Sequence, residues 1–587
     1  MRLALLLPLV AGCLEVPKGA GQECNYDSDC NTASGEVCDE GLCYGNPPTG
    51  NYAGTLSAPI EREDLISTEI PLLSFPVNGH LPDLELEAPV TFSGRVEAYC
   101  PASATCPTTS IAAEVRLTRP SRFPGGPALR LSAQSKAGVP RGTDSFSILL
   151  PRTHEGDEPY TVTIDGDGGG EKPAANGGTD PAELVPPKRL VLYATDNLEH
   201  QTYSLGGANP VVITGVLKDA LGGYLTSYRV VALGRWDTDA GTTEVSTVDY
   251  VTNGQYSITL SEGLVGPIEL VAKSFDPNVT APELHVVGVL PSSQMRNIGQ
   301  PTGLGSRVEV TIPIKGVSAE GPVEPVSGAR VIITGRQEAA FPGAATALFT
   351  QEVITGDDGL AKFALLDGMQ LQQSYRLRVI PPASSDLGVV FGAELDLQKP
   401  AMVQLPKRVK LRGRVLDVTG QPLADVSVTA RRSLRFLWSL DSDNQEFLDE
   451  IPAATAITQE AGDFVVWVDP ALADAWAFYD LSFKTPTGSS APSWMIPDFQ
   501  IPRLATQTMV EVNDVVIPDG AYVRGKVVDP AGNPVEGSAL RVFLLPTTDQ
   551  LCYEVTHAPD NCSVEATVMG DGESDMQGIV RLDLPRP

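Results

Sequence analysis

The chain has 587 residues, too many for one hydrophobic core, so several domains are expected. Apolar residues make up 42% and charged residues 20%, which is typical of folded protein and argues against a disordered chain. The net charge of -31, with no offsetting cluster of Lys or Arg, would repel a phosphate backbone and argues against nucleic acid as a partner.

The first residues have the pattern of an export signal. Arg2 precedes an apolar run, Leu3 to Val10, that is too short to span a bilayer and has the length of a secretory signal. The run ends LVAGC at residues 9–13, which resembles the lipobox of bacterial lipoproteins. This resemblance implies that residues 1–12 are removed, that Cys13 carries the lipid, and that the chain is anchored to the outer membrane, on its periplasmic face or at the cell surface. A plain secretion signal with a chance cysteine is the alternative.

Eight of the nine cysteines remain once Cys13 is set aside, and they fall into local groups, as disulfides in an exported protein would. The first group is spaced C-x5-C-x7-C-x4-C in a stretch with few apolar residues, so we expect covalent bonds to hold it together. Its three possible pairings stay open, and a zinc site is the competing interpretation. The disulfide candidates are Cys24, Cys30, Cys38, Cys43, Cys100, Cys106, Cys552 and Cys562.

The first cysteine group also carries a family resemblance. From Cys24 to Cys43 it resembles a small Dickkopf-type cysteine-rich module, and we assign residues 13–48 to the lipidated N-terminus and this module. The stretch that follows is rich in Gly, Pro and Asn from Tyr44 to Pro59. Residues 49–88 are therefore predicted to be a linker.

Three patterns recur in fixed order along the rest of the chain. The first is a strand with a central glycine, a turn with Gly and Pro, and a second strand, as in VKLRGRVLDVTGQPLADVSVTA at residues 409–430. The second is a polar turn, a glycine and an aromatic strand, as in TGDDGLAKFAL around Phe363. The third is an alternating strand that often starts with tyrosine, as at Tyr375 and Tyr479. Their period of two predicts half-buried β-strands.

Together the three patterns resemble the carboxypeptidase regulatory-like family, which implies transthyretin-like β-sandwiches. The predicted fold class is therefore all-β, a tandem array of about five antiparallel sandwiches after a disulfide-rich module. The fourth unit matches best and the first is degenerate. The fifth ends before its third pattern, so we expect it to lack its last strand and to expose a sheet edge. The predicted units are residues 89–200, 201–300, 301–405, 406–518 and 519–587.

The common catalytic motifs are absent from the sequence. Its five histidines are isolated from one another, and neither a zinc pattern on a helix nor a G-x-S-x-G elbow nor a phosphate loop is present. The zinc carboxypeptidase domain that such sandwiches accompany elsewhere is absent, so its activity cannot be transferred. We therefore predict a protein that is not an enzyme and requires no cofactor.

Two kinds of residue could bind a ligand. Acidic stretches with glycine offer hard oxygen ligands suited to calcium, and exposed tryptophans could stack on sugar rings. Solvated turns and packing in the core are the respective alternatives. The calcium candidates are Asp165, Asp167, Glu171, Asp571, Glu573 and Asp575. The stacking candidates are Trp476 and Trp494, which lie in stretches rich in Ala and Pro that resemble loops.

These observations favour a non-enzymatic, lipid-anchored envelope protein whose extended sandwich array is a binding or spacer module. The membrane, through the anchor, is the expected partner, together with a glycan or an envelope protein. An adhesin that binds carbohydrate or matrix is the second hypothesis. A hydrolase with a dispersed site is the third, and it requires histidines and carboxylates to converge in one pocket.

Overall fold

The computed structural model is all-β over the residues that it describes, which confirms the predicted fold class. No helix among those residues is long and apolar enough to cross a membrane. The described residues are 23–99, 109–166, 185–195, 198–236, 242–276, 281–301, 307–317, 323–340, 344–367, 374–382, 385–397, 399–433, 453–470, 477–486, 491–501, 509–545 and 566–586.

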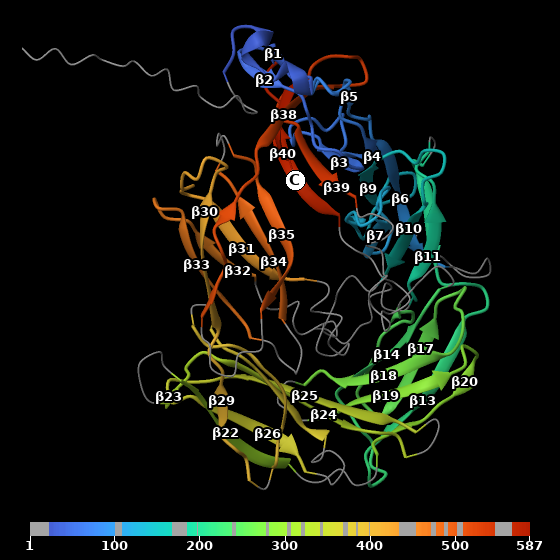
Figure 1. The fold of residues 1–587 in the computed structure, drawn as a ribbon. Helices are drawn as coiled ribbons and strands as arrows, with labels where there is room; N and C mark the ends of the chain where they lie inside the picture. The colour runs from blue at the N-terminus through green and yellow to red at the C-terminus, as the bar shows by residue number, and fades with distance from the viewer. Residues whose placement is uncertain are drawn as a thin grey trace, which may run out of the picture.

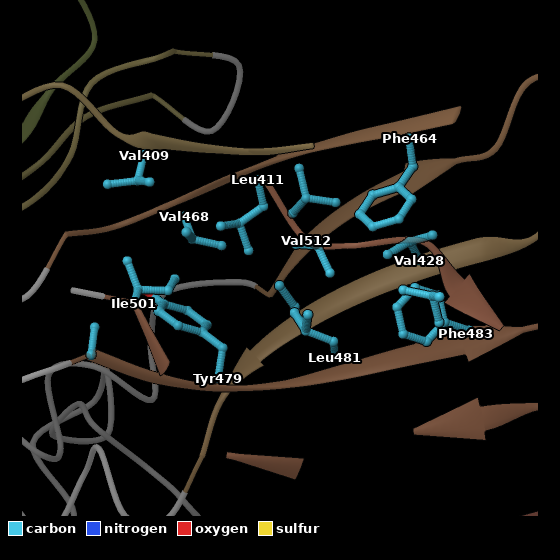
Figure 2. Packing of buried hydrophobic residues seen from close by; sticks show 14 of the residues in the cluster. Val409, Leu411, Val428, Phe464, Val468, Tyr479, Leu481, Phe483, Ile501 and Val512 are labelled. Atoms are coloured by element: carbon cyan, nitrogen blue, oxygen red, sulfur yellow. The ribbon is translucent and has the colours of Figure 1, made fainter. Parts of the chain in front are cut away.

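The fourth sandwich shows the arrangement that the others repeat. Two sheets, of order β33-β30-β36 and β32-β31-β34-β35, enclose one apolar core, with β37 also paired to β30 (Figure 2). The alternating residues of its strands face that core, as their period of two predicts. Its strands are β30 (Val409–Leu416), β31 (Ser427–Arg432), β32 (Ala454–Ile457), β33 (Asp463–Val468), β34 (Ala477–Lys484), β35 (Trp494–Ile501), β36 (Met509–Glu511) and β37 (Val515–Val516).

Three further sandwiches precede it (Figure 1). Each has its own cluster of buried hydrophobic residues. The first contains β6 (Val90–Ala98), β7 (Ala113–Arg119), β8 (Leu129–Ser135), β9 (Phe146–Leu150), β10 (Tyr160–Asp165), β11 (Lys188–Leu192) and β12 (Gln201–Leu205). The second contains β13 (Val211–Lys218), β14 (Tyr228–Gly234), β15 (Thr243–Glu244), β16 (Asp249–Val251), β17 (Gln255–Leu260), β18 (Ile268–Ser274), β19 (Glu283–Val289), β20 (Gln294–Met295) and β21 (Ile298–Gly299). The third contains β22 (Arg307–Val317), β23 (Val323–Pro325), β24 (Arg330–Gln337), β25 (Thr346–Ile354), β26 (Leu360–Leu366), β27 (Arg376–Ile380), β28 (Val390–Glu394) and β29 (Val403–Leu405).

The first two sequence patterns are partners across one strand pair. Gly413 of β30 lies opposite Phe464 of β33, and a Cβ on Gly413 would approach both the Phe464 ring and the Val512 carbonyl oxygen to 2.8 Å. A side chain at this position would therefore collide with the aromatic ring that covers it. The same pairing occurs between Gly215 and Tyr256 and between Gly94 and Phe146.

The turn in the first pattern depends on an aspartate. Asp417 Oδ1 accepts hydrogen bonds from the backbone N–H groups of Thr419 (2.8 Å) and Gln421 (2.9 Å), which closes the turn between β30 and β31. Asp219 and Asp529 do the same at the equivalent turns of the second and fifth sandwiches. These carboxylates are therefore structural parts of the repeat.

The fifth sandwich is completed by strands from the other end of the chain. The C-terminal region supplies β38 (Gly520–Val528), β39 (Ala539–Leu544), β40 (Thr567–Glu573) and β41 (Ile579–Pro585). The N-terminal region supplies β3 (Tyr52–Ser57), β4 (Thr68–Leu73) and β5 (Leu84–Glu85). Strand β3 pairs antiparallel with β39, and β5 pairs parallel with β38.

These N-terminal strands take the places of β34, β35 and β37 in the fourth sandwich. Even an irregularity recurs: the register shifts between Tyr52 and Gly54 where β3 meets β4, and between Tyr479 and Leu481 where β34 meets β35. The prediction of a linker at residues 49–88 is therefore wrong. The prediction of an exposed sheet edge in the fifth unit is also wrong, because β3 covers that edge of β39.

The five sandwiches form a closed circuit, whereas the sequence predicts an extended array (Figure 1). The second and third share a nine-stranded sheet, in which Glu283 to His285 of β19 pair with β25. The first touches the fifth through the rings of Phe123 and Phe543, whose centroids are 5.3 Å apart. The circuit closes because the two ends of the described chain lie in one sandwich.

Candidate functional site

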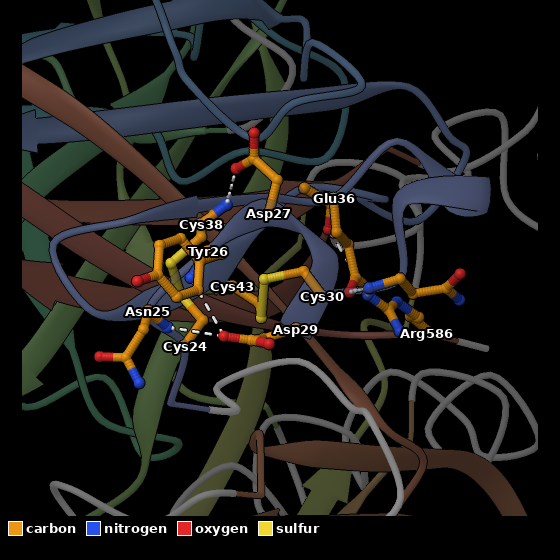
Figure 3. The surroundings of a disulfide bond; sticks show 12 residues. Cys24, Asn25, Tyr26, Asp27, Asp29, Cys30, Glu36, Cys38, Cys43 and Arg586 are labelled. Atoms are coloured by element: carbon orange, nitrogen blue, oxygen red, sulfur yellow. Dashed lines mark hydrogen bonds and ion pairs between the residues drawn. A yellow bond between two sulfur atoms is a disulfide. The ribbon is translucent and has the colours of Figure 1, made fainter.

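A small disulfide-bonded module precedes the N-terminal strands. Cys24 bonds Cys38 and Cys30 bonds Cys43, which selects one of the three pairings that the sequence left open (Figure 3). Its regular elements are two 3-10 turns, Asp27–Asp29 and Thr32–Ser34, and the strands β1 (Val37–Asp39) and β2 (Leu42–Tyr44). We call residues 23–48 the Cys-rich module.

Hydrogen bonds between polar side chains and the backbone stabilise this module, in place of a large hydrophobic core. Asp29 Oδ2 accepts hydrogen bonds from the backbone N–H groups of Asn25 (2.9 Å) and Tyr26 (3.0 Å), and Asp27 Oδ1 accepts one from Cys38 (2.8 Å) (Figure 3). The sulfurs of Cys24, Cys30 and Cys43 form the one metal-like cluster in the described part of the chain. All of these sulfurs are in disulfides, so zinc has no free thiolate here.

Ion pairs dock the Cys-rich module on the C-terminal strands. Arg586 Nη2 lies 2.8 Å from Glu36 Oε1, and the Glu36 side chain is only 2% exposed (Figure 3). Arg581 Nη2 lies 2.7 Å from Glu40 Oε2, and this hydrogen bond lowers the pKa of Glu40. The arginines lie at one end of the sequence and the carboxylates at the other. We call this contact between the termini the clasp.

A buried tyrosine fills the centre of the clasp. Tyr44 is completely buried, with the Arg524 guanidinium 5.6 Å from its ring centre and the His80 ring packed edge-on at 5.9 Å. Arg524 also pairs with Asp39, and the backbone N–H of Gly45 donates to the Tyr522 carbonyl oxygen at 3.0 Å. The module is thus fixed to β38 by rings, charges and backbone together.

A carboxyl group without a hydrogen-bond partner lies on the neighbouring strand. Both oxygens of Asp583 in β41 are buried, and neither has a partner in the described part of the chain. Burial raises the pKa of Asp583 to about 7, although the nearby Arg586 acts in the opposite direction. The carboxyl is therefore partly protonated near neutral pH.

Asp583→Asn should stabilise the fifth sandwich at pH 8 by about 2 kcal/mol. The folded protein holds this proton up to about pH 7, whereas the unfolded chain releases it near pH 4, so the wild type loses stability as the pH rises between these values. Denaturation followed by hydrogen exchange over residues 520–586 measures the gain. The gain should shrink towards pH 4. Asp571→Asn, at an exposed carboxylate of β40, is the control and should change the stability at pH 8 by less than about 1 kcal/mol.

The seam between the second and third sandwiches holds a histidine between two carboxylates. His285 Nδ1 lies 2.7 Å from Glu269 Oε1, and Nε2 lies 3.0 Å from Glu283 Oε1. Burial lowers the pKa of His285, but the two hydrogen bonds outweigh it and raise the value to about 9. The imidazole is therefore charged at neutral pH and bridges β18 and β19.

His285→Gln should cost up to about 3 kcal/mol at pH 6, and much less at pH 10. The contribution is complete below the unfolded pKa of about 6.5 and is lost as the pH rises through the folded value of about 9. Hydrogen exchange of β18 and β19 at both pH values checks it. A cost of equal size at the two values would contradict the charged bridge.

In the described chain, no predicted calcium ligand belongs to a cluster of groups close enough to share a metal ion. The acidic stretch from Gly570 to Asp575 was expected to be a glycine-bearing loop, but its residues 570–573 belong to strand β40, which corrects that expectation. Asp575 Oδ1 accepts hydrogen bonds from the backbone N–H groups of Gln577 and Ile579, and its Oδ2 lies 2.9 Å from Arg581. Asp165 ends β10, 3.3 Å from Arg116. Several candidates lie outside the described residues: Asp167, Glu171, Trp476, Cys13, Cys100, Cys106, Cys552 and Cys562.

Trp494 is also placed differently from its prediction. It begins the edge strand β35, where it pairs with Phe483 and packs partly buried against the core of the fourth sandwich. The sequence suggested a loop because Pro is frequent there, but an edge strand tolerates Pro497 where the register shifts between Ile496 and Phe499. Trp494 therefore lies in an edge strand with its side chain partly buried.

The histidines of the described chain do not build a catalytic relay. Asp144 accepts from both Ser93 (2.5 Å) and the His200 ring (2.9 Å), so the carboxylate lies between the hydroxyl and the imidazole. A serine nucleophile needs the imidazole in that middle position to take its proton. His154 lies near Glu87 and Asp157 elsewhere in the first sandwich. His80 and His285 lie near carboxylates in other sandwiches, and His557 lies outside the described residues.

The clasp was not predicted from the sequence. The signal was present, because Tyr52 starts an alternating stretch, YAGTLS, of the third-pattern type that the fifth unit lacks. It stands more than 450 residues from the rest of that unit, so no local search along the chain pairs them.

No family model and no curated protein matches the chain. Solved structures similar to it include a minor pilin of Streptococcus agalactiae, 13% identical over 36% of this chain and 96% of that one, with a TM-score of 0.19. A streptococcal ancillary pilin is 11% identical over 52% of this chain and 99% of that one, with a TM-score of 0.18. A shaft pilin of Lactobacillus rhamnosus GG is 12% identical over 36% and 98%, with a TM-score of 0.17. The assignment of tandem β-sandwiches therefore rests on the strand pairing of the chain itself, and the family resemblances stay predictions.

Proposed function

We propose that this chain is a non-enzymatic, lipid-anchored protein of the bacterial outer membrane, whose five sandwiches form a closed binding platform. The observation that carries the proposal is the clasp, because it joins the N-terminal module and the C-terminal strands in one sandwich. The lipid anchor on Cys13 is the element of this proposal that we infer from the sequence.

The clasp favours a platform over a spacer. A spacer needs its attachment point at one end and its free surface at the other, whereas here the circuit returns to the sandwich that carries the anchor (Figure 1). Ten peptide steps separate Cys13 from Glu23, which is at most about 35 Å of extended chain. The fifth sandwich is then the base at the membrane, and the second and third sandwiches face away from it.

Membrane fractionation tests the anchor. The full-length chain should partition into the detergent phase of its native envelope, and Cys13→Ser should shift it to the soluble export fraction, because one residue carries all the acyl chains. Cys24→Ser is the matched control: it breaks the Cys24–Cys38 disulfide of the Cys-rich module and should leave partitioning unchanged. A wild-type chain that is soluble, or an unmodified Cys13 by mass spectrometry, would overturn the proposal.

The carbohydrate-binding alternative finds no support at Trp494, whose ring packs against the core. A partner for the platform is therefore best sought by crosslinking in intact envelopes, followed by purification of the detergent-solubilised chain. We expect an envelope protein that is lost when the circuit is opened by Leu56→Asp.

A further inference from the structure

We propose that the clasp is exchangeable between two copies of this chain, so that residues 23–86 of each copy complete the fifth sandwich of the other. The juxtaposition that carries this inference is a sandwich whose halves come from opposite ends of one chain. We call residues 23–86 the N-terminal segment.

The strand pairs and ion pairs of the clasp join the N-terminal segment to residues 520–586. The pairs of β3 with β39 and of β5 with β38 are of this kind, and so are Arg581 with Glu40 and Arg586 with Glu36. None of them requires both partners to belong to one chain. A second copy therefore offers the same hydrogen bonds, ion pairs and buried surface.

In the exchanged form, the first sandwich would stay packed against the N-terminal segment of its own chain. Residues 87–89 connect β5 and Leu86 to β6 directly, and Arg119, whose side chain is 2% exposed, lies 3.2 Å from Glu69 of β4. Arg122 donates to the Glu69 carbonyl oxygen at 3.0 Å. This buried network is intrachain in both forms, so exchange leaves it unbroken.

The joint that must adapt is the one between the fourth and fifth sandwiches. In the described residues neither a strand pair nor a shared hydrophobic cluster connects these two sandwiches. Lys484 and Asp571 approach to 3.6 Å there, with side chains 68% and 46% exposed. An exposed pair of this kind contributes at most about 1 kcal/mol. The circuit therefore opens here with little loss of contact.

Because the contacts are the same in both forms, concentration decides between them. Within one chain, the N-terminal segment has an effective concentration at its own C-terminal strands, and this value depends on how closely the other four sandwiches bring the two ends together. The segment of a second copy competes for those strands once the concentration of copies approaches that value. Anchoring on a membrane would raise the local concentration of copies. That last step rests on the proposed function, whereas exchange in solution does not.

Two singly substituted full-length copies with different affinity tags test the exchange. Thr55 of β3 lies directly opposite Arg541 of β39, and both are solvent-accessible. Thr55→Cys in one copy and Arg541→Cys in the other can form a disulfide only if one copy's segment enters the other's sandwich. After joint incubation and oxidation, we expect a crosslinked pair carrying both tags, with a yield that rises with concentration.

The fourth sandwich provides the matched control. Thr429 and Ser482 are opposite one another at the equivalent positions of β31 and β34, so copies with Thr429→Cys and Ser482→Cys should not crosslink when mixed. The double variant Thr55→Cys/Arg541→Cys should crosslink within one chain at low concentration, which verifies folding and register. If the double variant crosslinks and the mixed single variants do not at any concentration up to about millimolar, the exchange is refuted. Absence of crosslinking in both would refute the clasp itself. Neither result depends on Cys13.

Discussion

Leu56→Asp is expected to unfold the fifth sandwich while the other four stay folded. Leu56 of β3 is completely buried in the core that β38, β39 and β41 share with the N-terminal strands. An aspartate there leaves a carboxyl without a partner in an apolar core and removes the packing of the leucine, at a cost above about 4 kcal/mol. The loss is local because each of the other sandwiches has its own core.

Two measurements check this prediction. The backbone amides of residues 520–586 should lose their protection from hydrogen exchange, and those of residues 409–484 should keep it. Small-angle scattering should show a larger radius of gyration, because the circuit opens when its closing sandwich unfolds. Ser57→Asp, at the exposed neighbour on the opposite face of β3, should change neither quantity. A compact Leu56→Asp variant with intact exchange protection would mean that the closed circuit does not depend on β3.

Asp469→Ala should destabilise the joint between the third and fourth sandwiches by about 3 to 5 kcal/mol. The Asp469 side chain is 4% exposed and pairs with Arg408 at 3.3 Å and with Arg432. Its Oδ1 also accepts a hydrogen bond at 3.2 Å from the backbone N–H of Val389, in the third sandwich. Alanine leaves two buried guanidinium groups without their carboxylate, and that unpaired charge carries the cost.

The control for this prediction is an exposed pair on the same sandwich. Arg414 lies 2.7 Å from Asp514, with side chains 46% and 50% exposed, so Asp514→Ala should cost less than about 1 kcal/mol. Differential scanning calorimetry compares the two variants, and proteolysis near residues 385–408 localises the change. Equal effects of the two substitutions would contradict the role of the buried network.

Local chemistry explains why the repeats could be predicted. The glycine of the first pattern and the aromatic residue of the second are cross-strand partners, as Gly413 and Phe464 show, so their order in the sequence reflects a contact between strands. The Asp417 turn closes through its own neighbours. Such features depend on residues within about fifty positions of one another, and period and turn chemistry reveal them.

The same local rules misassigned strands with unusual composition. The Gly-Asp run in β40 suggested a loop, yet a Cβ on Gly572 would lie 2.3 Å from the Arg581 carbonyl oxygen, so the glycine permits β41 to approach. Trp494 and Pro497 suggested a loop in the same way and lie in an edge strand. In both cases a neighbouring sheet, absent from any local window, decides the conformation.

The sequence by itself determined the kind of protein: an all-β chain with a Cys-rich module and repeated sandwich units, because alternation, turns and cysteine spacing are local properties. Only the tertiary structure decided the disulfide pairing, the closed circuit and the clasp. The disulfide pairing is a choice among cysteines 13 and 14 residues apart whose spacing alone does not select partners. The circuit and the clasp depend on contacts such as Tyr52 with Leu544 and Arg581 with Glu40, whose partners are hundreds of residues apart. The fifth unit lacked its last strands in sequence, and burial of its open core selected the strands at the other end of the chain.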